Sequence, residues 1–229
     1  MKLFRVGVLI FFMSFFSGIK AQVNLDSLKS IISSRTHDTN KINALVAWDN
    51  EIYLNNPELD LELNLRVVSL CDSNLNKQAD KFELEKFKKS LANSYNNIGI
   101  IYDDQGNYEK ALEYYEKSLK IKEEIGDKGG MGRTLGNIGS IYRDQGNYEK
   151  ALEYFERDLK IKDDIGDKGG MGYSLVNIGI IYFDQGNYEK ALEYYEKSLK
   201  IGDKRIMTAC YNNIGNIYYY QGNNEKALE

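Results

Sequence analysis

The sequence predicts an all-α protein, a right-handed solenoid of antiparallel helix pairs, and two observations carry that prediction. First, a segment of about 40 residues recurs almost unchanged, which is the signature of a repeat architecture. It begins at Asn97, and near-identical copies begin at Asn137 and Asn177. Second, the apolar residues of each copy follow the 3.6-residue spacing of helices that bury one face. The marker glycines of successive copies are Gly99, Gly139, Gly179 and Gly215.

Each repeat is expected to contain two helices joined by a tight turn. The first helix should cover about residues 91–105, where Tyr95, Ile98 and Tyr102 share one face. Gly106 should end it and Asn107 should cap the next helix, since glycine and asparagine favour those two positions. The second helix should run over residues 108–125, and the stretch 126–130 should turn the chain into the next repeat. Its buried stripe is expected at Ala111, Leu112, Tyr115, Leu119 and Ile125.

The last interval between marker glycines is 36 residues rather than 40. The four residues 162–165 have no counterpart after Ile201, and four residues are about one helical turn, so this stretch should be helical. Only two residues follow Ala227. The fourth repeat therefore lacks most of its second helix, and we expect the chain to be a fragment of a longer protein.

The first 21 residues differ from the rest of the chain. A short basic start is followed by an apolar run from Val6 to Phe16 and by small residues near Ala21. This pattern predicts a signal peptide over residues 1–21, although an uncleaved N-terminal anchor remains an alternative. Residues 22–78 should form N-terminal helices with a degenerate repeat, with a helix capped at Asp38 and a restart at Pro57. The polar segment 72–80 is expected to be a loop before the array over residues 79–229.

The repeats resemble the tetratricopeptide repeat, in a variety with a 40-residue period. The first copy matches that pattern at Tyr95, Ile98-Gly99, Tyr102, Ala111, Tyr115 and Ser118. The second copy departs from it at Asp158, where a small residue is usual. The other structural positions of the pattern are Tyr142, Tyr182 and Tyr218 in the first helices and Ala151, Ala191 and Ala227 in the second helices. The resemblance implies helix pairs that cross closely at Gly99 and Ala111, with the family's aromatic positions in the core.

Composition argues against most kinds of chemistry. One His, two Cys and a net charge of −4 argue against a zinc site, a His-based catalytic triad and a disulfide framework, and they give no electrostatic reason to bind nucleic acid. We therefore expect no metal, no catalytic residues and no cofactor. Cys71 and Cys210 are expected to be buried and unbridged. The glycines between Gly126 and Gly136 follow a helix rather than a strand, so they indicate an interhelical turn and not a dinucleotide site.

The best functional signal is an asparagine two residues before each marker glycine. A side-chain amide donates and accepts hydrogen bonds, so a row of amides can hold the backbone of an extended peptide. Some members of the resembled family use an Asn ladder here, but the same residues could instead cap or bridge neighbouring helices. The candidate peptide-binding residues, expected on the concave face, are Asn97, Asn137, Asn177, Asn213, Arg133, Arg143, Tyr173 and Phe183.

These observations predict an exported module that binds a protein or peptide and is not an enzyme. The mature chain should be periplasmic or secreted, and no stretch after residue 21 is apolar enough to span a membrane. The sequence is also similar to exported tetratricopeptide proteins of Bacteroidetes-type bacteria. In such proteins the repeats often form the sensor portion of a histidine kinase, a cyclase or a transcriptional regulator. A periplasmic sensor role in signal transduction is therefore the alternative.

Overall fold

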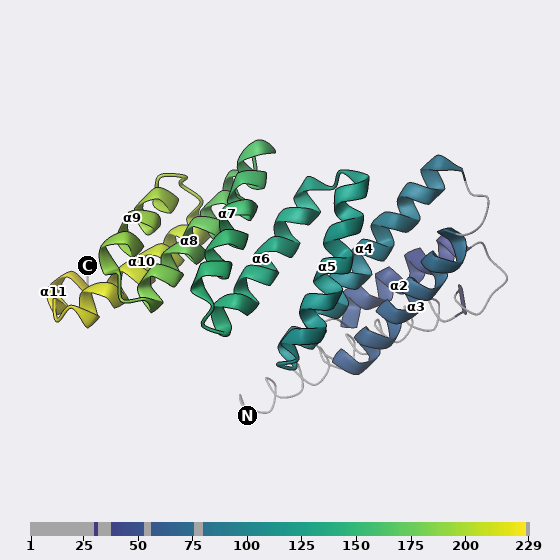
Figure 1. Ribbon diagram of the computed structural model, residues 1–229, viewed down its shortest axis with the longest axis horizontal. Coiled ribbons are helices and arrows are strands. Elements are labelled where there is room, and N and C mark those ends of the chain that lie inside the picture. The colour runs from purple at the N-terminus through teal and green to yellow at the C-terminus, as the bar shows by residue number, and fades with distance from the viewer. Residues whose placement is uncertain (1–29, 32–37, 53–55, 76–79, 228–229) are drawn as a thin grey trace, which may run out of the picture. The chain divides into compact units, whose positions relative to one another are not determined.

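The computed structural model describes residues 30–31, 38–52, 56–75 and 80–227, and within these ranges the regular structure is helical throughout. The all-α class predicted from the sequence is therefore confirmed. The chain divides into two compact units, one up to Ile101 and one from Tyr102 onward. Figure 1 labels the helices along the chain. The predicted signal peptide, residues 1–21, lies outside the described residues.

The first unit contains helices α2 (Asp38–Ile52) and α3 (Pro57–Leu75) and most of α4 (Lys81–Asp104). The expected starts at Asp38 and Pro57 are both found. The Asn74 side chain near the end of α3 donates a hydrogen bond to Asp38 Oδ2 at the start of α2, 3.0 Å away, so the two helices run antiparallel. Two predictions were wrong in detail. Residues 72–75 are helical, and α4 begins ten residues before the expected position 91.

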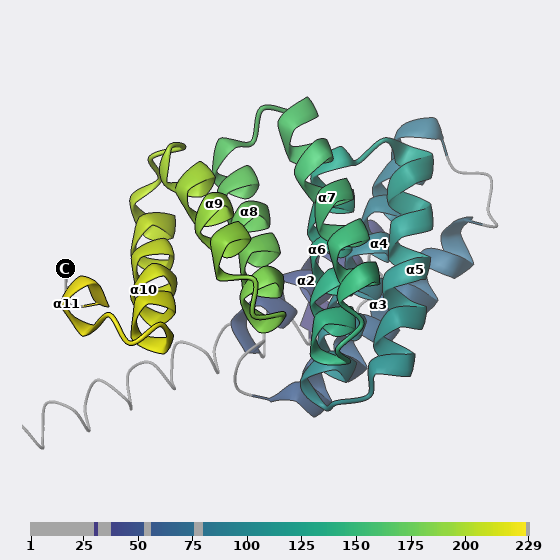
Figure 2. The same cartoon turned by 60° about the vertical axis from the view of Figure 1, so that its left-hand side comes forward.

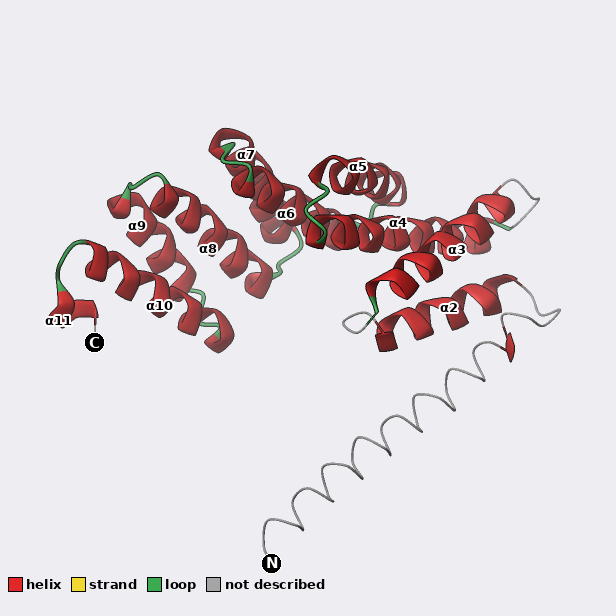
Figure 3. Cartoon of the chain, turned by 90° about the horizontal axis from the view of Figure 1, so that it is seen from below, coloured by secondary structure: helices red, strands yellow, loops and turns green. Residues whose placement is uncertain are grey.

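The second unit continues the pairing predicted from the repeats. Each helix packs against the next one along the chain, and α10 also contacts α8. Seen from below in Figure 3, α5, α7 and α9 lie on one side of this unit, and α6, α8 and α10 lie on the other. Its helices after α4 are α5 (Tyr108–Ile125), α6 (Lys128–Asp144), α7 (Tyr148–Asp164), α8 (Lys168–Asp184), α9 (Tyr188–Leu199), α10 (Lys204–Tyr220) and α11 (Asn224–Ala227).

The turn inside each repeat follows the expected chemistry. Gly106 has φ of +72°, a left-handed conformation that glycine adopts without strain. Asn107 then caps α5, because its side-chain oxygen accepts a hydrogen bond from the backbone N–H of Lys110 at 3.3 Å. The turn between repeats is shorter than expected. Asp127 caps α6 through the N–H of Gly130 at 2.9 Å, so Gly129 and Gly130 belong to a helix and not to a loop.

The marker glycines lie where two helices cross closely, as the family pattern implies. A methyl group added at Gly139 would lie 3.0 Å from the ring of Phe155, and one added at Gly179 would lie 2.5 Å from the ring of Tyr195. Both rings belong to the second helix of the same repeat and are fully buried, as are the motif residues Ala111, Ala151 and Ala191. Glycine at these positions therefore lets the paired helices approach.

Two lysines lie where one repeat meets the next, the first buried and the second partly buried. Lys122 of α5 is 1% exposed, and its ammonium group donates a hydrogen bond to Thr134 Oγ1 of α6 at 2.9 Å. Lys162 occupies the equivalent place on α7 and donates to Ser174 Oγ of α8 at 3.1 Å. The lysine stems pack over Gly130 and Gly170, at 3.0 and 2.7 Å from where a Cβ atom would stand. These glycines make room for the lysine stems.

Asp158, which departs from the family pattern, is the partner of the second lysine. Its carboxylate is 1% exposed and lies 2.7 Å from both Lys162 Nζ and Ser174 Oγ. A methyl group at Gly132 would come 2.8 Å from Asp158 Oδ1, so this glycine admits the larger side chain. Burial raises the pKa of Asp158, while the hydrogen bonds from Lys162 and Ser174 oppose that shift.

The third junction, between α9 and α10, lacks the lysine because the four-residue gap in the sequence removes it. The changes are coordinated. Ile206 stands where Gly130 and Gly170 stand in the earlier junctions, and Cys210 replaces Thr134 and Ser174. Ile206 and Cys210 belong to one buried apolar cluster with Tyr195 and Val176. Cys71 and Cys210 are both buried and unbridged, as the sequence predicted.

The tyrosines of the first helices are less buried than the family pattern implies. Tyr102, Tyr142 and Tyr182 are half-buried and stack on Tyr114, Tyr154 and Tyr194, with ring centroids 5.4–5.7 Å apart. A lysine of the second helix lies over each first-helix ring at 4.9 Å: the contacts are Lys110 with Tyr102, Lys150 with Tyr142 and Lys190 with Tyr182. The ring faces are therefore covered within each repeat, so these tyrosines hold the helix pair together rather than offering a stacking surface to a ligand.

Candidate functional site

One side of α6, α8 and α10 carries three of the four predicted asparagines, and we call it the asparagine face. On each helix its members follow one another at intervals of three or four residues, which places them on one helical side. Figure 2 shows these helices in order towards the C-terminal end. The asparagine face consists of residues 133, 137, 140 and 144 of α6, residues 173, 177, 180 and 184 of α8, and residues 213, 216 and 220 of α10.

The four predicted asparagines do not behave alike. Asn97, in the first unit, donates a hydrogen bond to Asn64 Oδ1 of α3 at 3.4 Å. Asn64 is buried and in turn donates to Asp60 Oδ1 at 2.7 Å, so Asn97 bridges neighbouring helices. Asn137, Asn177 and Asn213 are half-buried, and their amides make no hydrogen bond with another described residue. The bridging alternative therefore applies at the first position, and the ligand role stays a prediction at the other three.

An aromatic row of Phe183, Tyr219 and Tyr220 lies at the C-terminal end of the asparagine face and includes one of its members, Tyr220. Phe183 of α8 contacts Tyr220 of α10 with ring centroids 5.6 Å apart, and Tyr220 contacts Tyr219 at 5.8 Å. Tyr219 and Tyr220 are each 65% exposed. Large aromatic side chains this exposed are concentrated at sites of protein association. Tyr173, another predicted contact, is also exposed and lies on α8 within the asparagine face.

Carboxylates accompany the aromatic row at the ends of α4, α6 and α8. The pKa of Asp103 is raised by burial and by the nearby charges of Asp104 and Asp144. Burial likewise raises the pKa of Asp184, where Arg143 opposes the shift and Asp144 adds to it. Arg143 itself donates two hydrogen bonds to Asp144, at 2.7 and 3.0 Å. Arg143 therefore lies close to Asp144 and Asp184, and the carboxylates at these helix ends favour cationic groups.

The remaining residues on the first helices of the repeats differ in their exposure. Arg133 is exposed and Arg143 is half-buried at the other end of the same helix. Val176 of α8 is only 6% exposed and belongs to the apolar cluster with Cys210. The aromatic row was partly foreseen, since Phe183 and Tyr219 fall at the same repeat position.

Neither metal chemistry nor membrane insertion is indicated by the described part of the chain. No three His, Cys, Asp or Glu side chains among these residues converge as metal ligands would. Among the described helices, none combines the length and the apolar character needed to cross a membrane.

Comparison with known proteins agrees with the geometry. The tetratricopeptide repeat model matches residues 90–164, 130–204 and 170–229, which together cover more than half of the chain. No curated protein matches the sequence at a significant level.

Solved structures share the fold at low sequence identity. BtubC from P. vanneervenii superposes with a TM-score of 0.72 at 18% identity, over 92% of this chain and 85% of that one. A putative kinesin light chain of Podosopora anserina with nearly identical repeats gives a TM-score of 0.64 at 16% identity, over 85% and 92%. The Rap conjugation gene regulator of plasmid pLS20, solved with the Phr* peptide, gives 0.65 at 15% identity, over 86% of this chain. The present chain spans only 54% of that regulator.

Proposed function

Because the chain belongs to the tetratricopeptide-repeat family, we propose that its asparagine face binds an extended segment of a protein or peptide. The carrying observation is that Asn137, Asn177 and Asn213 present amides on one side of the first helices of three successive repeats, without a described hydrogen-bond partner. An extended backbone has alternating donors and acceptors, and an amide can satisfy either kind. Such contacts depend little on the side chains of the ligand, so they give affinity to many sequences.

The surroundings of the amides define which segments bind best. Phe183, Tyr219 and Tyr220 offer aromatic surface at the C-terminal end of the face. Asp144 and Asp184 lie beside them and carry negative charge. A segment with an apolar side chain followed or preceded by a basic one would match both features. Partial desolvation of the Asp184 carboxylate strengthens its attraction for a cation, because screening by water is reduced there.

The structural neighbours support a binding role of this kind, although they establish the fold alone at such low identity. The Rap regulator, which superposes over most of this chain, was solved with a peptide. A sensor role in a longer signalling protein is the second proposal, and it would use the same face to detect a peptide. Under either proposal the repeats act as a non-catalytic scaffold, as is typical of this fold.

We expect the double change Asn137→Ala and Asn177→Ala to weaken peptide binding about fivefold or more without changing the fold. Each lost hydrogen bond should contribute roughly 0.5–1.5 kcal/mol. The measurement is a screen of the purified protein against a random peptide library, followed by titration of the selected peptides by fluorescence anisotropy.

The matched control is Glu116→Ala with Glu123→Ala, two exposed changes on α5, which should leave affinity unchanged. Circular dichroism and thermal melting of each variant show whether it is folded. Unchanged affinity in the folded asparagine variant would exclude the amides from binding. Loss of the folded state would instead assign them a structural role.

We also propose that the protein is exported, since the basic start, the apolar run Val6 to Phe16 and the small residue Ala21 occur together. Cleavage after Ala21 is the expected result, leaving Gln22 as the first residue of the mature chain. Mass spectrometry of the protein from its native host checks this. A mature chain that still contains the apolar run would rule out cleavage.

A further inference from the structure

The first unit contains a polar pocket between α2 and α4 that belongs to none of the repeat positions. Its volume is about 310 Å³, which is at the lower end of the range for small-molecule sites. Helix α4 begins at Lys81, several turns before Tyr95, the first motif residue. The pocket therefore forms along the N-terminal extension of α4, which α6 and α8 lack. Its lining residues are Thr39, Ile42 and Asn43 of α2 and Lys86, Phe87, Lys89, Ser90 and Asn93 of α4.

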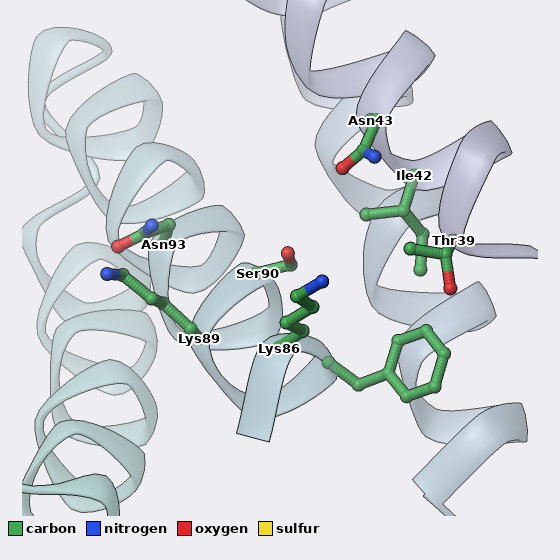
Figure 4. Close-up of a pocket in the computed structure, with 8 residues that line it drawn as sticks. Thr39, Ile42, Asn43, Lys86, Lys89, Ser90 and Asn93 are labelled. Atoms are coloured by element: carbon green, nitrogen blue, oxygen red, sulfur yellow. The ribbon is translucent and has the colours of Figure 1, made fainter. Parts of the chain in front are cut away.

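The pocket combines positive charge with hydrogen-bonding groups. Figure 4 shows Lys86 and Ser90 directed towards Asn43 and Ile42 on α2, while Lys89 lies beside Asn93. Neither lysine forms an ion pair with any residue that the structure describes. The Lys86 ammonium group instead lies 4.1 Å from the centre of the Phe82 ring on its own helix. A cation held in this way keeps its charge available for an anion entering the pocket.

The floor of the pocket is apolar. It consists of Ile42 and Phe87, lining residues that are 2% and 3% exposed. A simple inorganic anion would leave this floor without a contact. A ligand with an apolar body and one charged end would cover the floor and still place its anionic group near Lys86, Ser90 and Asn43. Lysine supplies a compact charge that attracts carboxylate and phosphate oxygens alike.

We propose that this pocket binds a small organic anion, with its carboxylate or phosphate group at Lys86 and its apolar part on Ile42 and Phe87. The proposal concerns the first unit and does not depend on peptide binding at the asparagine face. It gives the protein a second, separate ligand site. Occupation of this site and of the asparagine face can be measured independently.

The test uses four probes on the purified protein: phenyl phosphate, benzoate, the neutral benzyl alcohol and inorganic phosphate. Binding is followed by ¹⁵N–¹H NMR titration. At least one of the two organic anions should cause saturable shifts at the amides of Asn43, Ser90 and Asn93, and the tighter anion identifies the preferred charged group. Benzyl alcohol should bind at least tenfold more weakly, because it lacks the charge.

Lys86→Ala should weaken anion binding about tenfold, and Lys89→Ala should weaken it less. Lys81→Ala, at the exposed start of the same helix, is the control and should have no effect. The proposal is overturned if neither organic anion gives saturable shifts at these residues, if Lys86→Ala binds as well as the unchanged protein, or if benzyl alcohol binds equally well. Inorganic phosphate matching phenyl phosphate would also overturn it, since the apolar floor would then contribute nothing.

Discussion

Replacing Lys122 by methionine is expected to stabilise the protein at pH 7 by about 1–3 kcal/mol. Burial lowers the pKa of Lys122 from 10.5 to about 8, and each pH unit of such a difference corresponds to roughly 1.4 kcal/mol. Methionine keeps an unbranched stem over Gly130 but carries no charge to desolvate. Thr134 stays satisfied without the lysine, because its hydroxyl donates to the carbonyl oxygen of Gly130 at 3.2 Å. Loss of the Lys122 hydrogen bond offsets part of the gain.

The same change at Lys162 is expected to have the opposite sign. Its removal leaves Asp158 buried without its cation, which should destabilise the protein by roughly 1–3 kcal/mol. This is less than the 3–5 kcal/mol typical of a fully buried pair, because the Lys162 side chain keeps 15% of its surface exposed. The two lysines occupy equivalent repeat positions, so each variant serves as the control of the other.

The dependence on pH distinguishes the two effects. The charged form of Lys122 destabilises the folded state, so the advantage of methionine should be complete below pH 8 and should disappear as pH rises towards 10.5. The pKa of Asp158 is raised in the folded state and should rise further without Lys162. The loss caused by Lys162→Met should therefore shrink as pH falls and Asp158 becomes protonated.

Urea unfolding at several pH values measures all of these free energies. Destabilisation by Lys122→Met at pH 7 would mean that its hydrogen bond to Thr134 outweighs the desolvation of the ammonium group. Equal effects of the two changes would mean that Asp158 does not distinguish the two junctions.

A series of glycine-to-alanine changes should follow the room available at each position. Gly179→Ala should destabilise most and Gly139→Ala next, by roughly 1–3 kcal/mol each, because the new methyl group would meet the buried rings of Tyr195 and Phe155 at 2.5 and 3.0 Å. Gly129→Ala should be neutral or stabilising by up to about 1 kcal/mol. Its Cβ would have no neighbour closer than 3.9 Å, and alanine favours a helix.

Denaturant midpoints of the three variants check this order. Equal losses at Gly139 and Gly129 would show that the close helix crossing has been assigned to the wrong place. A larger loss at Gly139 than at Gly179 would show that the Tyr195 ring moves aside more easily than the Phe155 ring.

Sequence periodicity was sufficient for most of the fold because the repeats combine local signals that agree. The helix over residues 108–125 has the expected bounds, since the Asn107 cap, the apolar stripe and Gly126 all specify it. The start of α4 was misplaced because the segment before position 91 lies outside the repeated pattern. The pocket at Lys86 was missed for the same reason.

Lys122 illustrates a contact that could not be predicted from the sequence. Lys122 falls four residues after Ser118 on the stripe that includes Ala111 and Tyr115, so its position alone indicated burial. Its charge argued against burial, and only the structure shows that Gly130 and Thr134 accommodate it. Asn97 is similar, because its partner Asn64 lies 33 residues away in the sequence.

The coordinated changes at Lys122, Lys162 and Ile206 bear on how such a chain can evolve. Nearly identical coding segments recombine easily, and unequal exchange adds or removes whole units. Here each first helix is matched to the second helix that precedes it. In α6 and α8, a glycine and a hydroxyl side chain contact the lysine of the preceding helix. In α10, Ile206 and Cys210 fill the space that a lysine would need. An exchange that placed α10 after α7 would press the Lys162 stem against Ile206 and leave its ammonium group facing a thiol. The residues at each junction therefore fit only one neighbouring repeat. Selection can preserve the order of the repeats for this reason, although their sequences are nearly identical.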